Sequence, residues 1–377
     1  MAGKQEANPF LGRRIFLLRS ELGLTQSELA DKLGFGSRQS LQQLEADERK
    51  LSVEEMLQLM ELSGKSFEYF TDPFLWDGDG QFSFRSSDAD AEQLNTFEQK
   101  AGGWIMLWRW LRVVNECPVR MLPGFDLGIR SSYEEVQAAA EQLVQWLQLG
   151  KTPAATLGAV LERELGIPVL YADIPQGISG ATCHSLRGNV IFVNRHDVQG
   201  RRNFDLAHEL FHVLTWKEMP PERLDRDDPE DKSAQRRETL ANIFASTLLM
   251  PETEVRAMWS MHFGRGRDIP IELDFLHTGA DYFLVSEEAF VWRLVSLEYI
   301  SKENALQLIG RIQAAGSAVE QSAAVPALFS RFFLEQLAVA LVAGKLSVRR
   351  AAKQLTLSVD ELEEAYHTHD LTVPFDM

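Results

Sequence analysis

Hydrophobic and polar positions follow a helical period over most of this chain. In residues 91–116 and 132–149, apolar side chains recur at every third or fourth position, the spacing that gathers them on one face of an α-helix. Residues 167–171 and 188–194 are instead rich in β-branched side chains next to glycine and proline, which predicts strands. Residues 177–185 lie between them and predict an edge strand. The pattern predicts a mostly helical, multidomain chain with one α+β region in its middle.

One helical segment, residues 204–216, holds a histidine pair and a glutamate. It reads FDLAHELFHVLTW, is mostly apolar and contains no glycine or proline, so it predicts a buried helix. His208 and His212 are four residues apart and lie one above the other on a helix, with Glu209 turned aside. Two imidazoles at this spacing suit one metal ion, with Glu209 as general base. The alternative is a buried helix whose histidines bond to backbone groups.

The next predicted helix, residues 237–250, offers a third metal ligand. Glu238, Ala241, Asn242 and Ala245 share one stripe, and the small alanines allow this helix to approach the histidine helix closely. The Glu238 carboxylate could then reach the metal, and Asn242 could hydrogen-bond a ligand imidazole. The alternatives are a carboxylate favoured by the helix dipole at Glu238 and a solvent-facing amide at Asn242.

Three segments in order resemble the ImmA/IrrE family of metallo-endopeptidases: VIFVN (190–194), RRNFDLAHELFHVL (201–214) and ETLANIFASTLLMP (238–251). The resemblance implies a zincin-like, gluzincin-type α+β fold in which His208, His212 and Glu238 bind zinc, or manganese, and Glu209 is the catalytic base. Such proteases cleave or destabilise transcriptional repressors, which implies a repressor or antitoxin-like protein as the partner. In zincin-like proteases an edge strand beside the metal pairs with the substrate backbone, the role expected of residues 177–185.

The first 70 residues have the cadence of a helix-turn-helix. Thr25 and Glu28 stand at capping-box spacing, Gly34 permits a turn, and Ser37 precedes a third helix. This pattern resembles the repressor-like domains of the XRE class. The resemblance implies binding to double-stranded DNA at an operator.

The side chains expected to contact that DNA come from two helices. Arginine reads guanine and glutamine reads adenine, so the start of the third helix is predicted to face base edges, and arginines of the first helix are predicted to contact phosphates. The predicted base-reading residues are Arg38, Gln39, Gln42 and Gln43, and the predicted phosphate contacts are Arg13, Arg14 and Arg19.

Charge sets a condition on any DNA contact. The net charge of −17 opposes nonspecific binding to nucleic acid or anionic membrane. Residues 1–70 hold nine Lys and Arg against eleven Asp and Glu, a balance of −2. DNA binding therefore needs a local, well-shaped surface, and the alternative for this domain is a helical protein–protein module of the same fold.

Four domains are predicted: a helix-turn-helix domain (1–70), a linker with a docking helix (71–130), a metallopeptidase domain (131–300) and a helical C-terminal module (301–377). The last has a second helix-turn-helix-like cadence, but its would-be recognition helix is acidic, so we interpret it as a packing or homodimerisation module. Two cysteines, no leader-like N-terminus and no apolar run of membrane length predict a cytoplasmic protein without membrane contact.

These observations predict a metal-dependent endopeptidase fused to a DNA-binding domain, which regulates transcription by cleaving a repressor or antitoxin-like partner. The alternative is an XRE-type regulator or antitoxin whose peptidase-like domain senses a partner without turnover. The presence of Glu209 favours the enzyme, because a sensor has no need of a general base. His262, His277 and Tyr282 are candidates for stabilising an oxyanion, and the sequence does not choose among them.

Overall fold

The computed structural model describes residues 9–76, 80–86, 90–122, 124–175, 178–185, 188–225, 231–266, 269–315 and 325–376. Contacts divide the chain into two compact units. The first comprises Met1–Asp79, Glu98–Cys117 and Glu335–Met377, and the second comprises Gly80–Phe97 and Pro118–Leu334. No helix among the described residues combines the length and the apolarity needed to cross a bilayer.

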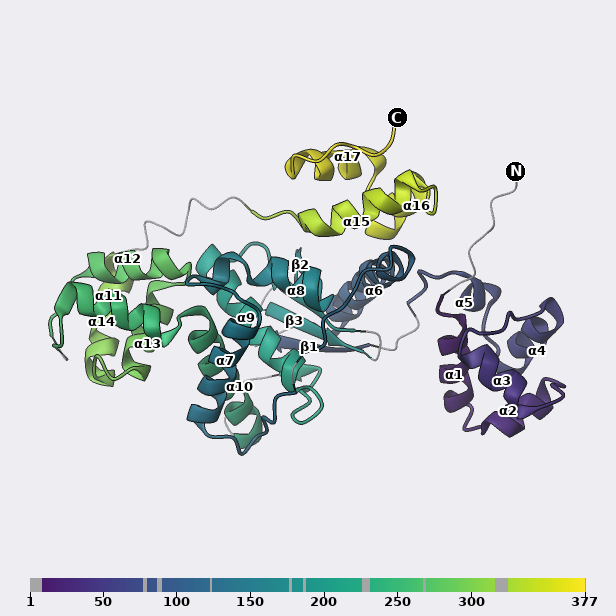
Figure 1. Ribbon diagram of the computed structural model, residues 1–377, viewed down its shortest axis with the longest axis horizontal. Helices are drawn as coiled ribbons and strands as arrows, with labels where there is room; N and C mark the ends of the chain where they lie inside the picture. Colours follow the sequence, from purple (N-terminus) through teal and green to yellow (C-terminus); the bar gives the residue numbers. More distant parts are fainter. Residues whose placement is uncertain are drawn as a thin grey trace. The chain divides into compact units, whose positions relative to one another are not determined.

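The first unit begins with a small helical domain, shown in purple and blue in Figure 1. The capping box predicted at Thr25 and Glu28 is present, and the Ser37 hydroxyl accepts a hydrogen bond from the Ser40 amide. The core of the domain contains Ile15, Leu18, Leu29, Leu41, Leu44, Leu59 and Phe70. Its helices are α1 (Leu11–Glu21), α2 (Gln26–Lys32), α3 (Arg38–Glu45), α4 (Val53–Ser63) and α5 (Phe67–Thr71).

The first unit also includes α6 (Ala91–Val114) from Glu98 onward, the helix predicted for residues 91–116. Its tryptophans pack inward, as expected, with Trp104 and Trp108 each 2% exposed. The Trp104 indole donates a hydrogen bond to the Leu355 carbonyl at 3.0 Å. The C-terminal helices are α15 (Arg331–Val342), α16 (Val348–Leu355) and α17 (Val359–Thr368).

The second unit contains a five-stranded sheet in the order β2-β4-β3-β1-β5. β2 and β4 are parallel, β3 is antiparallel to both of its neighbours, β4 and β1, and β5 is parallel to β1. The strands are β1 (Gln81–Ser86), β2 (Val169–Ala172), β3 (Ile178–His184), β4 (Val190–Asn194) and β5 (Leu224–Asp225).

Helices surround that sheet and extend its core. Helix α9 packs on β3 and β4, and Ile191 and Val193 of β4 share a core with Leu206 and Leu210 of α9. The helices are α7 (Tyr133–Trp146), α8 (Leu157–Leu165), α9 (Gln199–Thr215), α10 (Lys232–Leu249), α11 (Glu252–Phe263), α12 (Leu273–Phe283), α13 (Glu287–Ser296) and α14 (Lys302–Ala315), with a 3-10 turn at Pro153–Ala155.

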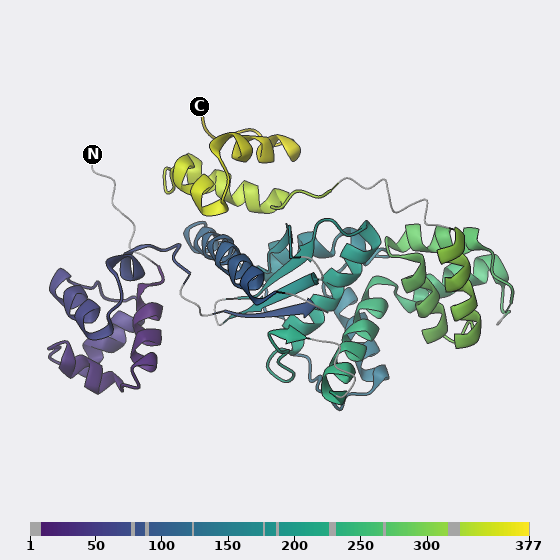
Figure 2. The same cartoon turned by 180° about the vertical axis from the view of Figure 1, so that it is seen from behind.

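The predicted edge strand is not at an edge. β3 covers residues 178–184 of the predicted 177–185, and Gly177 lies outside the described residues. However, β1 pairs with β3 on the side away from β4. Figure 2 shows β1 as a dark blue arrow beside the teal strands. The expectation was wrong because β1 comes from residues 81–86, about a hundred positions earlier, and such nonlocal pairing leaves no mark on the β3 sequence.

The expected domain boundaries also shift. Residues 71–130 were expected to link two domains, yet β1 within them belongs to the sheet, where the alternating Phe82 and Phe84 are buried. Residues 301–377 were expected to form one helical module. Instead α14 joins the core of the second unit through Ala305, Leu308 and Ile309, and the first unit takes the chain from Glu335 onward.

Candidate metal centre and recognition helix

His208 and His212 lie on α9 and are almost fully buried, at 0% and 4% exposure. The helix presents both rings on one side because they are four residues apart. Their Nε2 atoms are 3.1 Å apart. The local spacing read from the sequence therefore brings two imidazole nitrogens to one point.

Helix α10 brings Glu238 to the same point. Its Oε2 lies 3.1 Å from Nε2 of His208, and its Oε1 lies 3.3 Å from Nε2 of His212. The predicted alanines, Ala241 and Ala245, are 0% exposed, as a close approach of α10 to α9 requires.

This donor set fits a divalent metal ion. Ligand atoms about 2.0–2.1 Å from zinc in a tetrahedral site lie about 3.3 Å from one another. His208, His212 and Glu238 come within 4.8 Å, and no other trio of His, Cys, Asp or Glu does so in the described part of the chain. Two imidazoles and one carboxylate are also a set that zinc takes in sites with an open position.

Asn242 lies one turn after Glu238 and contacts the other ring nitrogen of His208. Its Oδ1 is 3.0 Å from Nδ1. If this oxygen accepts, Nδ1 of His208 carries the proton and Nε2 keeps its lone pair for a metal ion. Burial raises the pKa of Glu238, but hydrogen bonds to His208 and His212 outweigh burial and hold that pKa well below its usual range.

Glu209 is 3% exposed and is held by β3. The Thr182 hydroxyl donates a hydrogen bond to its Oε2 at 2.6 Å. A Cβ atom at Gly180 would stand only 3.1 Å from Oε1 of Glu209, so glycine preserves space there. Oε1 is thus the carboxylate oxygen beside that space. Thr182 was not foreseen, although a polar residue at an inward position of a strand is a signal that could have identified it.

The predicted DNA-reading side chains of α3 lie on its outer face. Leu41 and Leu44 point into the core, whereas Arg38, Gln39 and Gln42 are exposed and Gln43 is half-buried. Nε of Arg38 donates to Oε1 of Gln26 at 3.0 Å, which ties the start of α3 to α2.

Arg14 is not available to phosphate. Its side chain is 0% exposed, and its guanidinium donates to the carbonyls of Tyr69, Asp72 and Leu75 at 2.6–2.7 Å. The expectation of a phosphate contact was wrong because these acceptors come from residues more than fifty positions later. Arg14 joins α1 to α5 and to the segment that follows it.

Two regions of the chain match known protein families. Residues 162–295 match the IrrE N-terminal-like domain of the peptidase M78 family, and residues 15–70 match a helix-turn-helix domain. The chain carries an IrrE-like peptidase domain after an XRE-type helix-turn-helix domain. The IrrE-like match includes α9 and α10, the helices that carry His208, His212 and Glu238.

No curated protein matches the chain. Among solved structures, a Mycobacterium tuberculosis transcriptional regulator is 18% identical, with a TM-score of 0.33. The similarity covers 50% of this chain and 51% of that one, so this chain spans about half the length of the regulator.

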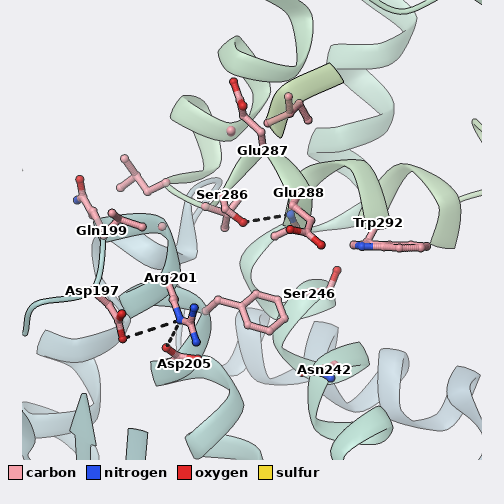
Figure 3. Close-up of a pocket in the computed structure, with 18 of the residues that line it drawn as sticks. Asp197, Gln199, Arg201, Asp205, Asn242, Ser246, Ser286, Glu287, Glu288 and Trp292 are labelled. Carbon is pink, nitrogen blue, oxygen red and sulfur yellow. Dashed lines mark hydrogen bonds and ion pairs between the residues drawn. The ribbon is translucent and has the colours of Figure 1, made fainter. Parts of the chain in front are cut away.

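A pocket of about 1,100 Å³ in the second unit reaches Asn242 of the IrrE-like domain. Figure 3 shows Arg201 beside Asp197 and Asp205, with Trp292 on another part of the wall. Arg201 pairs with these carboxylates at 3.9 and 3.8 Å. The amide that bonds His208 therefore also lines a pocket in which Asp and Glu outnumber Arg.

The other histidine and tyrosine candidates of the IrrE-like domain have partners of their own. His277 pairs with Asp281 and Glu287 at 3.4 and 3.3 Å, and the Tyr282 hydroxyl donates to Glu254 at 3.4 Å. His262 packs against the rings of Phe263 and Phe275.

Proposed function

We propose that this chain is a divalent-metal-dependent endopeptidase fused to a DNA-binding domain, and that it regulates transcription by cleaving a repressor or antitoxin-like partner. The convergence of His208, His212 and Glu238 within 4.8 Å carries the proposal. Glu209 directly follows His208 in α9. The helix-turn-helix domain indicates DNA binding.

The site residues divide the chemistry among them. A divalent ion held by His208, His212 and Glu238, zinc or alternatively manganese, supplies a Lewis acid that makes water more acidic. Glu209 takes the proton of the attacking water and later delivers it to the leaving amine. The Thr182 hydroxyl, which donates a hydrogen bond to Oε2 of Glu209 at 2.6 Å, holds this carboxylate in position.

Metal content tests the ligand assignment. Purified protein should contain about one equivalent of zinc or manganese by elemental analysis, and His208→Ala should lose it. His196→Ala is the matched control, because His196 is exposed and pairs with Asp173. Full metal content in His208→Ala would remove that residue from the site.

Glu209→Gln separates binding from chemistry. It should retain the metal and the partner while cleavage falls by about two to four powers of ten, whereas the exposed control Glu218→Gln should cleave normally. The assay uses as its substrate a repressor-type protein encoded beside this chain, and mass spectrometry identifies the fragments. Undiminished cleavage by Glu209→Gln would exclude Glu209 as the base.

The second candidate is a regulator whose peptidase-like domain senses a partner without turnover. The pairing of β1 with β3 favours it, since the strand beside Glu209 is already occupied. A sensor would regulate its promoter equally well with Glu209→Gln. A protease would lose regulation together with cleavage.

A further inference from the structure

The strand beside the catalytic base is the natural place for an extended peptide to bind. β3 holds Glu209 through Thr182, and an extended chain beside a strand gains affinity from backbone hydrogen bonds. On its other side β3 is paired with β4. On the side where a peptide would bind, β3 is paired with β1 of the same chain, with Ser83 directly opposite Thr182.

The two faces of β1 have different surroundings. Phe82 and Phe84 point to the face away from α9, where Phe82 stacks on Phe192 at 6.0 Å and Phe84 meets Phe97 at 6.0 Å. Ser83 points to the opposite face, the one that carries Thr182 and Glu209, because side chains alternate along a strand. β1 therefore presents aromatic side chains to one face and a small residue to the catalytic face.

We propose that β1 is an internal pseudosubstrate: it occupies the peptide-binding edge of β3 and must leave before a partner can pair there. The partner that replaces it is an extended protein segment with large apolar side chains at alternate positions and a small residue between them. The effect of β1 on cleavage rests on the proposed function, whereas peptide binding to β3 can be measured without cleavage.

Several features make β1 separable from the sheet. Among the described residues, β1 pairs with β5 on its outer side at two positions, and its register with β3 is interrupted between Phe84 and Ser86. The IrrE-like match, residues 162–295, includes β2, β3 and β4 but not β1. Those three strands with α9 and α10 retain the whole metal cluster. Departure of β1 would remove the buried contacts of Phe82 and Phe84. An incoming segment with the same alternation would replace these contacts with those of its own apolar side chains.

The native Cys183 provides a way to lock β1 in place. Phe82 stands directly opposite Cys183 in the antiparallel pair, and opposed residues have Cα separations that a disulfide can span. Phe82→Cys should therefore form a disulfide with Cys183 on oxidation by diamide. Cys117→Ser removes the only other cysteine of the chain. Phe82→Ser is the matched control, because it loses the same ring and cannot be locked.

The binding assay uses the full chain, loaded with zinc and carrying Glu209→Gln, and a fluorescent peptide of residues 80–86, GQFSFRS. The reduced Phe82→Cys protein should bind the peptide, and oxidation should weaken binding at least about tenfold, reversibly. The Phe82→Ser protein should bind equally under both conditions. The peptide GQSFFRS, which breaks the alternation, should bind weakly to both.

Two outcomes would overturn the proposal: equal peptide binding before and after the disulfide forms, as verified by mass, or no binding by any reduced form. Cleavage of the partner by the same Phe82→Cys variant with Glu209 restored gives an independent result. Binding that responds to the disulfide without any cleavage would refute the peptidase function and leave the peptide edge standing. Cleavage that the disulfide leaves unchanged would refute the peptide edge and leave the peptidase function standing.

Discussion

Helices α3 and α9 present their polar side chains in opposite ways. On α3, Arg38 and Gln42 are exposed on the face opposite the inward leucines, Leu41 and Leu44. On α9, His208, Glu209 and His212 are buried. Each has a partner from another element: Glu238 and Asn242 from α10, and Thr182 from β3. A buried polar group is costly unless it is bonded, so the proposed metal centre requires partners from several elements, whereas water can solvate the exposed side chains of α3.

Arg14 shows that the same rule operates in the helix-turn-helix domain. It is one of the charged side chains that the sequence suggested for DNA, yet it is buried and donates to three carbonyls, which gives it a structural role. The exposed fraction of a side chain therefore distinguishes residues that can contact a partner from residues that stabilise the fold. Four predictions test this distinction, beginning with Arg14.

Arg14→Ala should destabilise the N-terminal domain by about 3–5 kcal/mol, because one buried and two part-buried carbonyls lose their donor. Native-state hydrogen exchange of the α1 amides in the intact chain measures this loss. Lys32→Ala, at an exposed position of α2, should change exchange little. Unchanged α1 exchange combined with weaker DNA binding would instead restore Arg14 as a phosphate contact.

Glu162 predicts a pH effect on stability in the second unit. Burial raises its pKa to about 7, against the hydrogen bonds from Ser330 and Val169. Between pH 4.5 and 7 the folded chain keeps this proton while the unfolded chain releases it, so stability falls as pH rises, by about 3 kcal/mol in total.

Urea unfolding at pH 5, 6, 7 and 8 measures that slope. Glu162→Gln should flatten it, because an amide has no proton to lose in this range. Glu164→Gln, an exposed neighbour paired with Arg120, should keep the wild-type slope. A wild-type chain whose stability rises steadily from pH 5 to 8 would contradict the assignment.

Asn242→Ala should weaken metal binding about 10- to 100-fold, because His208 loses the group that orients its ring. Titration against a competing chelator measures the affinity. Gln235→Ala, at an exposed position of the same helix, is the control. If Asn242→Ala binds metal as tightly as the wild type, the contact with His208 has no part in the site.

Arg38→Ala or Gln42→Ala should have the smallest effect, about 1–2 kcal/mol at the promoter upstream of this chain's own gene and little on random DNA. The expected loss is modest for Arg38 because its Nε is already bonded to Gln26. Mobility shifts at two salt concentrations measure it, with the exposed Arg130→Ala as control. A wild type without preference for that promoter would identify the domain as a partner-binding module.

Local features of this chain follow from its sequence alone. His208 and His212 converge because four residues make about one helical turn, and Ser132 and Ser286 cap the helices that follow them. The exposed face of α3 follows from the phase of Leu41 and Leu44. Each depends on neighbours within a few positions, where backbone geometry determines which side chains meet.

Only the tertiary structure decided which distant segments meet. Thr182 reaches Glu209 from 27 positions away, Arg14 reaches Leu75 across 61, and Ser83 stands opposite Thr182 from about a hundred positions earlier. The sequence of a strand alternates in the same way whether its edge is open or paired. The sequence likewise does not distinguish an arginine that contacts DNA from one that donates to backbone carbonyls. These contacts form because burial demands partners for polar groups and strand edges, and the competition for those partners involves the whole fold.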